Sequence, residues 1–335
     1  MSSFCHIHLL NLIPISYSSE ILQMKHRIIS LSILVIMAAS NVQAVDKISD
    51  EAMLIDAFAI ASADDSVNKI EFEKNAEIIL TAPVRYTGTQ DLSIKGNGAT
   101  VDGAAGGRFD LDSDLSAITT DGTLIFNTAG NITIKNLTVV GSATRGIVVN
   151  IPADAEGDDI QVSLHKVNIL GSALYGLHID DNADEFDEGI EGSAIGIELN
   201  IMHSSFIGNG TGAIDFDGIR VDERGHGDIH AMISDTHIDA NGGDGIELDE
   251  AGDGNVDVTM KHVTLNANGF FNEEDLDDGF DIDEAGSGDI EVSLFEVEAI
   301  YNRDEGLDFD EEDEGDVRLK LRRVKVINNT DEGIK

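Results

Sequence analysis

A glycine followed by an apolar residue recurs along the chain at nearly constant spacing, and this repeat constrains the fold more than any other feature. The spacings are 30, 42, 27, 34, 27 and 27 residues, and polar insertions at 182–192 and 271–277 account for the longest two. A pattern that returns every 27 residues predicts a solenoid of stacked units. The glycines of these pairs are Gly146, Gly176, Gly218, Gly245, Gly279, Gly306 and Gly333.

Each repeat unit carries the two-residue alternation that is typical of half-buried strands. In the unit that opens at Gly245, apolar and polar residues alternate over 246–248, 256–260 and 263–265. We therefore expect three short strands per unit, each in register with the strands of the neighbouring units. The chain has only 3 prolines, as expected when interior strands must donate ladder hydrogen bonds.

An asparagine follows the third strand in four successive units. Stacked units place equivalent residues about 4.8 Å apart, and an amide can both donate and accept a hydrogen bond along the stack. This column predicts a structural ladder rather than a functional site. Its members are Asn241, Asn268, Asn302 and Asn329.

The strand pattern and the asparagine column resemble the right-handed parallel β-helix proteins of the pectate-lyase-like superfold. The amphipathic stretch 50–63, followed by apolar alternation at 70–72 and 92–103, is similar to the helix that caps their first coil. The resemblance covers about 48–335 and implies an all-β, right-handed parallel β-helix with three strands and about 27 residues per coil. Enzymes, adhesins and binding modules share this superfold, so the resemblance specifies fold more than function.

The amino-terminal residues predict export. Residues 24–44 have the basic start, apolar run and small residues of a signal peptide, with cleavage expected after Ala44. The apolar run is too short to span a bilayer, so we expect a secreted or periplasmic protein without a membrane span once the signal is removed. Residues 1–23 form an extension, untranslated or misassigned, that contains the only cysteine, Cys5.

The mature chain is expected to comprise two parts. Residues 45–105 would form the cap and first coils, and 106–335 the β-helix proper. The sequence stops at the opening of a further coil, at 330–335, without the polar capping segment that a solenoid end requires. We therefore expect the carboxyl-terminal cap to be missing.

The net charge is −43, with 64 acidic against 21 basic residues, which argues against a nucleic-acid partner. Acids recur in register at the end of the first strand and in the glycine-rich turn after it, where like charges about 4.8 Å apart repel. Calcium, which takes six to eight oxygen ligands, is the expected counterion, and a solvated acidic face in a salty habitat is the alternative. The predicted ligands are Asp180, Asp222, Glu223, Asp228, Asp249, Glu250, Asp283, Glu284, Asp289 and Asp310.

A candidate catalytic cluster lies on the outer face of the first strand, where the resemblance places the sites of pectate-lyase-like enzymes. His178, Arg220 and Glu247 occupy one outward position in three coils and form a candidate acid/base cluster beside Asp180 and Asp222, in which Arg220 is expected to stay charged. The tripeptide 225–227 is similar to a short motif of polygalacturonases, but the aspartates and basic segment that accompany it there are absent.

Two functions therefore remain open. The first is an exported, acidic, calcium-binding β-helix that acts as a structural, binding or adhesin-like module for a polysaccharide or another cell-surface ligand. The alternative is a polysaccharide-acting lyase or hydrolase that uses the outer face of the first strand. Without a complete catalytic motif, the residues favour the module over the enzyme.

Overall fold

The computed structural model describes residues 47–104, 122–181, 192–271, 276–312 and 314–335, which belong to one compact unit, Val45–Lys335. Within those residues, no helix is both long and apolar enough to cross a membrane. The predicted extension 1–23 and signal peptide 24–44 lie outside the described residues. Both therefore stay predictions.

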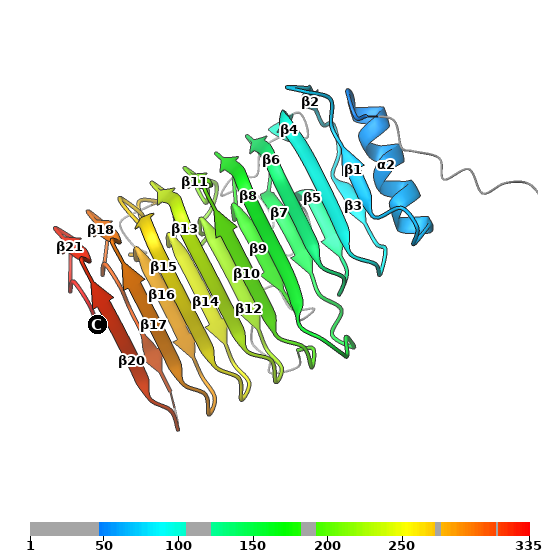
Figure 1. The fold of residues 1–335 in the computed structure, drawn as a ribbon. Helices are drawn as coiled ribbons and strands as arrows, with labels where there is room; N and C mark the ends of the chain where they lie inside the picture. Colours follow the sequence, from blue (N-terminus) through cyan, green and yellow to red (C-terminus); the bar gives the residue numbers. More distant parts are fainter. Residues whose placement is uncertain (1–46, 105–121, 182–191, 272–275, 313) are drawn as a thin grey trace, which may run out of the picture. The chain divides into compact units, whose positions relative to one another are not determined.

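A helix covers the first coil, as the sequence predicts. Helix α2 (Glu51–Ala63) begins after Asp50, whose carboxylate accepts a hydrogen bond from the backbone N–H of Met53 at 2.9 Å. Its buried side chains include Leu54 and Phe58, and the Phe58 ring lies 5.8 Å from that of Phe126 on the first coils. Figure 1 shows the helix across the blue end of the solenoid. It covers strand edges that would otherwise be open to pairing.

The larger of two parallel sheets contains thirteen strands. Its main path runs through β1 (Lys69–Glu71), β4 (Leu92–Asp102), β6 (Ile132–Val140), β8 (Ile160–Leu170), β10 (Ile197–Met202), β13 (Ile229–Asp239), β15 (Val256–Thr264), β17 (Ile290–Phe295) and β20 (Val317–Arg322). Off this path lie β2 (Glu77–Ile79), β11 (Ser205–Ile207), β18 (Glu298–Ile300) and β21 (Lys325–Ile327). Alternate side chains on these strands point into the core, as in Ile229, Ala231 and Ile233 of β13.

The smaller sheet faces the larger one across the core and contains the first strand of each coil. Its strands are β3 (Val84–Tyr86), β5 (Gly122–Asn127), β7 (Arg145–Asn150), β9 (Leu177–Asp180), β12 (Ile219–Glu223), β14 (Ile246–Glu250), β16 (Phe280–Glu284) and β19 (Asp310–Glu311). Each strand pairs in parallel with its equivalents one coil away; Ile246, for example, pairs with Ile219 and Phe280. The parallel β-helix predicted from the sequence is confirmed.

The second and third strands of several coils form one long bent strand, as in β8, β13 and β15. The bend is a single residue in the left-handed region, with φ of 57° at Lys166, 49° at Asp235 and 55° at His262. His203, with φ of 52°, occupies the same place between β10 and β11. The side chains therefore point as expected for two separate strands, but the backbone hydrogen bonds between coils continue around the bend.

The asparagine ladder is confirmed and extends one coil further than predicted. The side-chain amide of Asn209 donates to Oδ1 of Asn241 at 3.1 Å, and Asn241 donates to Asn268 at 3.0 Å. The ladder continues through Asn302 to Asn329 at 3.3 and 3.2 Å. Each oxygen also accepts the backbone N–H of the preceding ladder residue, so the column satisfies buried turn groups.

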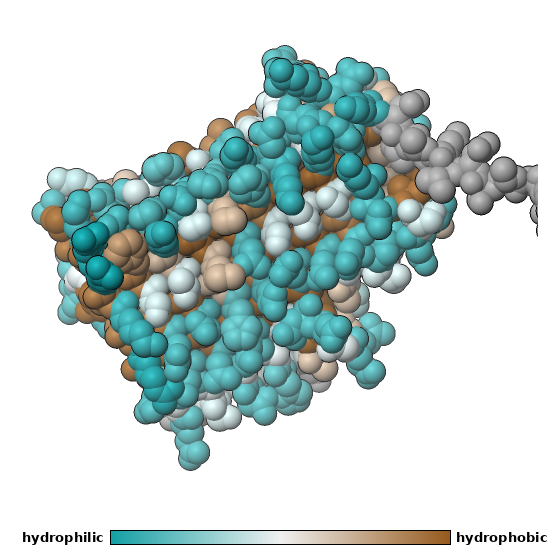
Figure 2. All heavy atoms as spheres, in the orientation of Figure 1, coloured by the Kyte–Doolittle hydropathy of each residue, from teal (hydrophilic) through white to brown (hydrophobic). Residues whose placement is uncertain are grey.

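The outer surface is dominated by polar side chains. Figure 2 shows hydrophilic residues over most of one face, with apolar side chains visible in the furrows between them. This distribution agrees with the net charge of −43 and with a core confined to the space between the two sheets.

Candidate ion-binding and catalytic site on the smaller sheet

The predicted column of aspartates is present on the outer face of the smaller sheet. Asp222 pairs in register with Asp180 and Asp249, and Asp283 pairs with Asp249 and Asp310. Asp180 and Asp222 are buried, whereas Asp310 at the other end is exposed. The 27-residue alignment therefore identified the vertical neighbours correctly.

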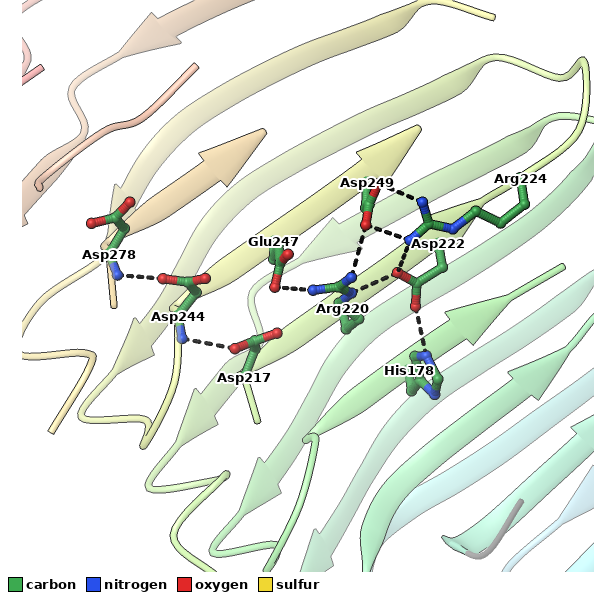
Figure 3. Close-up of polar contacts among 9 residues, drawn as sticks. All are labelled: His178, Asp217, Arg220, Asp222, Arg224, Asp244, Glu247, Asp249 and Asp278. Carbon is green, nitrogen blue, oxygen red and sulfur yellow. Dashed lines mark hydrogen bonds and ion pairs between the residues drawn. The ribbon is translucent and has the colours of Figure 1, made fainter. Parts of the chain in front are cut away.

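Two arginines neutralise the middle of this column. Nε of Arg220 donates to Asp222 at 2.6 Å, and its Nη2 donates to Asp249 at 2.9 Å (Figure 3). Its Nη1 forms an ion pair with Glu247, and Arg224 binds both oxygens of Asp249. Burial alone would raise the pKa of Asp222, but Arg220 and its hydrogen bond from His178 hold that pKa below its usual value. The basic residues are few in the whole chain, but two of them concentrate at this point of the column.

His178 forms a buried dyad with Asp222. Its Nε2 lies 2.8 Å from Oδ2 of Asp222, and its Nδ1 is buried without a hydrogen-bond partner in the described part of the chain. Burial lowers the pKa of His178 to about 4, so the imidazole is neutral near pH 7, and Nε2 donates the hydrogen bond to the carboxylate. Tyr175, whose ring centroid lies 4.7 Å from those of His178 and Phe216, covers the dyad.

The predicted metal ligands Glu223, Glu250 and Glu284 do not face outward with the aspartates. They are fully buried, and Oε1 of Glu250 accepts the backbone N–H groups of Gly252 and Gly254 at 2.9 and 3.2 Å. Glu223 and Glu284 bind the glycines of their own turns in the same way. The physical reason is that the turn after the first strand closes over this side chain and directs its N–H groups at the carboxylate.

Glycine is required in these turns because successive turns touch. A Cβ at Gly252 would lie 1.5 Å from the carbonyl oxygen of Gly225 in the preceding coil, and one at Gly286 would lie 1.5 Å from that of Gly252. The glycine pattern that suggested calcium loops therefore has a packing explanation.

Asp228 and Asp289, also predicted metal ligands, link backbone groups between coils. Oδ1 of Asp228 accepts the backbone N–H of Asn255 at 2.7 Å, and Oδ1 of Asp289 accepts that of Asp316 at 2.9 Å. Their second oxygens belong to a partly exposed edge, where Arg318 binds Asp289 at 2.5 Å. One oxygen of each aspartate therefore links two neighbouring coils.

Five groups of three carboxylates lie at the neighbouring end of the first strand. In each group the three oxygens lie within 4.8 Å of one another. The groups are Asp215–Asp217–Glu247, Asp244–Glu247–Asp281, Asp278–Asp281–Asp308, Asp278–Asp304–Glu305 and Glu305–Asp331–Glu332. We call these five groups the acidic row. Of the residues singled out from the sequence, only the catalytic candidate Glu247 belongs to it, and none of the ten predicted metal ligands does.

Most residues of the acidic row come from two sequence positions that recur in successive coils, and Asp215, Asp304 and Asp331 lie beside them. One position precedes the coil-opening glycine, as Asp244 precedes Gly245, and the other is the first outward residue of the strand, such as Glu247. Both positions recur in the sequence, but whether their side chains lie close together depends on the path of the backbone from the turn into the strand. Alternation within a strand does not reveal it.

The aspartates before the glycines use one oxygen internally and leave the other directed at the row. Oδ1 of Asp217 accepts the backbone N–H of Asp244 at 2.8 Å (Figure 3). Oδ1 of Asp278 accepts that of Glu305 at 2.6 Å. Asp217 is 0% exposed, and its Oδ2 has no hydrogen-bond partner in the described residues. This oxygen requires a proton or a cation.

Electrostatics agree with that requirement. Burial, offset in part by Arg220, raises the pKa of Glu247 to about 7. Burial and the charge of Glu305 raise the pKa of Asp278 to about 8, and burial with the charge of Asp283 raises that of Asp281 to about 10. The row therefore resists full ionisation near neutral pH unless positive charge is supplied.

Comparison with known proteins adds little to this geometry. No family model and no curated protein matches the chain. Among solved structures, the chain is similar to the A-module of mannuronan C-5 epimerase AlgE4 of Azotobacter vinelandii, at 10% identity and a TM-score of 0.31. The match covers 87% of this chain and 98% of the A-module. At that score it supports no functional argument, and the fold assignment rests on the strand pairing described above.

Proposed function

We propose that the protein is an exported β-helix whose acidic row binds calcium and that it acts as a structural or binding module. The observation that carries this proposal is the buried, unpartnered Oδ2 of Asp217, directed into a group with Asp215 and Glu247. The donor set consists of carboxylate oxygens, which calcium prefers. Consecutive groups share a carboxylate, as Glu247 and Asp281 do, so ions along the row would be bridged.

The metal sites predicted at the first-strand turns are less favoured by the geometry. Arg220 and Arg224 already neutralise Asp222 and Asp249, and Oε1 of Glu250 is committed to glycine N–H groups. Oε2 of Glu250 has no hydrogen-bond partner among the described residues, but no group of three ligand atoms within 4.8 Å of one another includes Glu250 there. Calcium binding is therefore best assigned to the acidic row.

Calcium in this row would serve recognition as well as stability. A surface of this charge repels anionic partners, and bound divalent ions reduce the repulsion and can bridge to carboxylates on a ligand. An acidic polysaccharide or an acidic cell-surface ligand is the partner class that we propose. Export rests on the signal peptide expected at 24–44.

Thermal unfolding of the calcium-free chain tests the ion sites. Calcium at about 100 times its dissociation constant should stabilise the fold by about 2.7 kcal/mol, because the ion binds only the folded row. Asp217→Asn, which keeps the oxygen that binds Asp244, should lose part of this response, whereas the exposed control Asp257→Asn should retain it. An equal shift with magnesium, or with sodium chloride at matched ionic strength, would refute specific calcium sites.

A second candidate function, action on a polysaccharide, is favoured by the His178–Asp222 dyad. Asp222 orients a neutral imidazole whose Nδ1 has no hydrogen-bond partner among the described residues, which is the arrangement of a general base. Because Nδ1 is buried beside Tyr175, this role requires the substrate to displace the Tyr175 ring. Glu247, with its pKa raised to about 7, is a candidate proton donor on the same face. Arg220 holds the two carboxylates apart and is a positioning residue rather than a base.

Incubation with acidic glycans tests this second function. A lyase would release unsaturated products, and a hydrolase would release new reducing ends. His178→Ala should abolish turnover, and Arg220→Ala should weaken it, while the exposed His226→Ala should not. Unchanged glycans at every pH between 5 and 9, with calcium present, would leave the binding module as the function.

A further inference from the structure

A group of basic side chains lies on the outer face of the larger sheet, away from the acidic row. Lys261, Phe295 and Arg322 occupy one outward position in register on β15, β17 and β20, and Lys320 is the preceding outward residue of β20. The residues that alternate with them are buried in the core or lie in register with buried ones, so these four side chains point away from the core. We call Lys261, Phe295, Lys320 and Arg322 the basic patch.

The three bases of this patch have no acidic partner, although the chain has 64 acidic and only 21 basic residues. Within the described ranges, Lys261, Lys320 and Arg322 form no ion pair and no hydrogen bond with a carboxylate. Arg318 on the same strand, by contrast, binds Asp289 at 2.5 Å. All three bases are exposed. The patch therefore presents positive charge that the surrounding acids do not neutralise by contact.

Phe295 is the positioning residue of the patch. The guanidinium of Arg322 lies over the Phe295 ring, 5.1 Å from its centroid, and that of Arg323 lies 5.6 Å from it. An aromatic face attracts a guanidinium and leaves the N–H groups at its edge accessible to a ligand. Arg323 donates to Glu296, whereas Arg322 has no such bond among the described residues. Because Arg322 is already ordered, it loses less entropy when it binds a planar anion.

A row of uncharged side chains runs beside the patch across the coils. Asn200, Met232, Thr259 and Ser293 are in register on successive strands, and Lys320 continues the row. Asn200, Met232 and Thr259 line a groove of about 300 Å³ on this face. Neighbouring strands are about 4.8 Å apart, so the row forms a straight track that contains amide and hydroxyl groups. Such a track suits a linear ligand that is rich in hydroxyl groups.

The two sides of this row carry opposite charge. Glu198, Asp257 and Glu291 belong to the outward position on one side. Lys261 and Arg322 belong to the position on the other side. An anionic group on a ligand is therefore repelled from the first side and attracted to the second. This asymmetry fixes the direction in which a ligand in the row turns its charged groups.

We propose that the basic patch binds an anionic polysaccharide, with carboxylate or sulfate groups, and that it needs no calcium to do so. The anions contact Lys261, Lys320 and Arg322, and the sugar hydroxyl groups bond to the neighbouring row. At about 0.15 M salt, charges more than about 8 Å away are largely screened, so the patch decides the interaction rather than the net charge of −43. The inference shares its ligand class with the proposed function but does not depend on the acidic row.

Binding of oligosaccharides of defined length to the full chain in EDTA tests the proposal, because the chelator removes any contribution from calcium. We expect oligogalacturonate, which carries carboxylates, or heparin oligosaccharide, which carries sulfates, to bind more weakly as salt is added. An uncharged cello-oligosaccharide should bind at least about tenfold more weakly, since it makes no charge-assisted hydrogen bond. Binding that appears only when calcium is added would support the acidic row and overturn the patch.

Variants of the patch should weaken this binding. Arg322→Gln and Lys261→Gln should each cost about tenfold, because each removes charge-assisted hydrogen bonds to the anion. Arg322→Lys keeps the charge but loses the planar fork and should restore only part of the affinity. Phe295→Leu, which frees the guanidinium, should cost about threefold, and Phe295→Tyr should restore binding. Lys74→Gln, at an exposed base of the first coils, is the matched control and should have no effect.

Acetylation of lysines gives a readout that does not depend on variants. Bound oligosaccharide should protect Lys261 and Lys320 from acetic anhydride, measured by mass spectrometry, and should leave Lys74 as reactive as before. The proposal is overturned if neither anionic oligosaccharide binds in EDTA or if Lys74→Gln loses as much affinity as Arg322→Gln. It is also overturned if the two lysines are protected without oligosaccharide by self-association, measured by sedimentation. That result would make the patch an interface between copies of this chain.

Discussion

Two columns of side chains run along the same set of turns, one made of amides and the other of carboxylates. In each coil the ladder asparagine is followed closely by an acid of the acidic row: Asp244 comes three residues after Asn241, and Asp217 eight residues after Asn209. Amides both donate and accept, so Asn241 bonds to the amide and backbone of its neighbours and leaves no buried group unsatisfied. Carboxylates only accept, so Asp217 satisfies one backbone N–H and leaves its second oxygen without a partner.

The difference shows that coil stacking places residues in files whatever their chemistry. In a column of amides, each side chain satisfies the hydrogen bonds of the next. A column of acids needs protons, arginines or metal ions to neutralise its charge. Each of the three appears in this molecule: arginines at the Asp222 column, raised pKa values at Asp278 and Asp281, and the proposed ions at Asp217. The predictions below test this contrast.

Removal of Arg220 should have the largest effect, because it leaves three buried or half-buried acids without their main counter-charge. We expect Arg220→Ala to lower the free energy of unfolding by about 3–5 kcal/mol, the usual cost of breaking a buried ion pair. Arg318, a 43% exposed residue that also binds several acids, is the control and should cost less than about 1 kcal/mol. Equal losses in urea unfolding would mean that the burial of the Arg220 cluster is unimportant.

Interruption of the asparagine ladder should be the next largest effect. Asn268→Ala removes the acceptor of the Asn241 amide and backbone and the donor to Asn302. Unsatisfied buried groups cost about 1–3 kcal/mol each, and partial relaxation limits the total to about 2–4 kcal/mol. Asn200→Ala, outside the ladder, serves as the comparison in the same unfolding experiment. A loss as small as that of Asn200→Ala would show that water replaces the ladder bonds.

The acidic row should make stability depend on pH when metal ions are removed. Glu247 and Asp278 have pKa values raised to about 7 and 8, mainly by burial, so their protonated forms favour the folded state. That contribution is complete below the unfolded pKa near 4 and is lost as pH rises through the folded values. In a chelator, the melting temperature should fall by about 5–10 °C from pH 5 to pH 8, or roughly 2–3 kcal/mol.

Calcium should flatten this profile, since the ion replaces the protons. If arginines already neutralised the acidic row, the melting temperature in chelator would not depend on pH. A flat profile would therefore contradict the prediction. A slope that calcium leaves unchanged would locate the titrating groups elsewhere.

The smallest effect is expected from the buried glutamates under the turns. Burial raises the pKa of Glu250 to about 7, although its hydrogen bonds with Glu223 and the turn glycines act in the opposite direction. Its stabilising contribution is therefore present below pH 4 and lost as pH rises through about 7. Glu250→Gln keeps an oxygen for the Gly252 and Gly254 N–H groups and should stabilise the chain at pH 8 by about 1–2 kcal/mol. Little difference from the parent is expected at pH 4. Destabilisation at pH 8 would indicate an ionised Glu250 bound to a cation.

Much of the fold can be predicted from the sequence because residues at equivalent positions of successive repeats become neighbours in the stack. Alignment of the glycine–apolar pairs predicts that Asp222, Asp249 and Asp283 are vertical neighbours, and the strand register confirms it. The asparagine ladder follows from the same rule. Asn209 was missed because 32 residues separate it from Asn241, although a residue in the left-handed conformation precedes both.

The candidate site is less predictable because it depends on directions that no repeat specifies. Two-residue alternation puts Glu250 on the inner side with Ile246 and Leu248 and Asp249 on the outer side. That the glycine N–H groups of the turn point at Glu250 is not part of that pattern. The acidic row joins Asp244, Glu247 and Asp281, which belong to a turn, a strand and the next coil. Such a junction follows from the path of the backbone in space rather than from spacing.

The contact between stacked turns at Gly225, Gly252 and Gly286 has an evolutionary consequence. Because these turns leave no room for a side chain, we expect their glycines to be retained in every unit that stacks on both sides. Duplication of one whole unit would lengthen the rod without disturbing its neighbours. It would also copy one ladder amide and one set of acids, so the capacity for bound cations would grow in proportion to the number of windings.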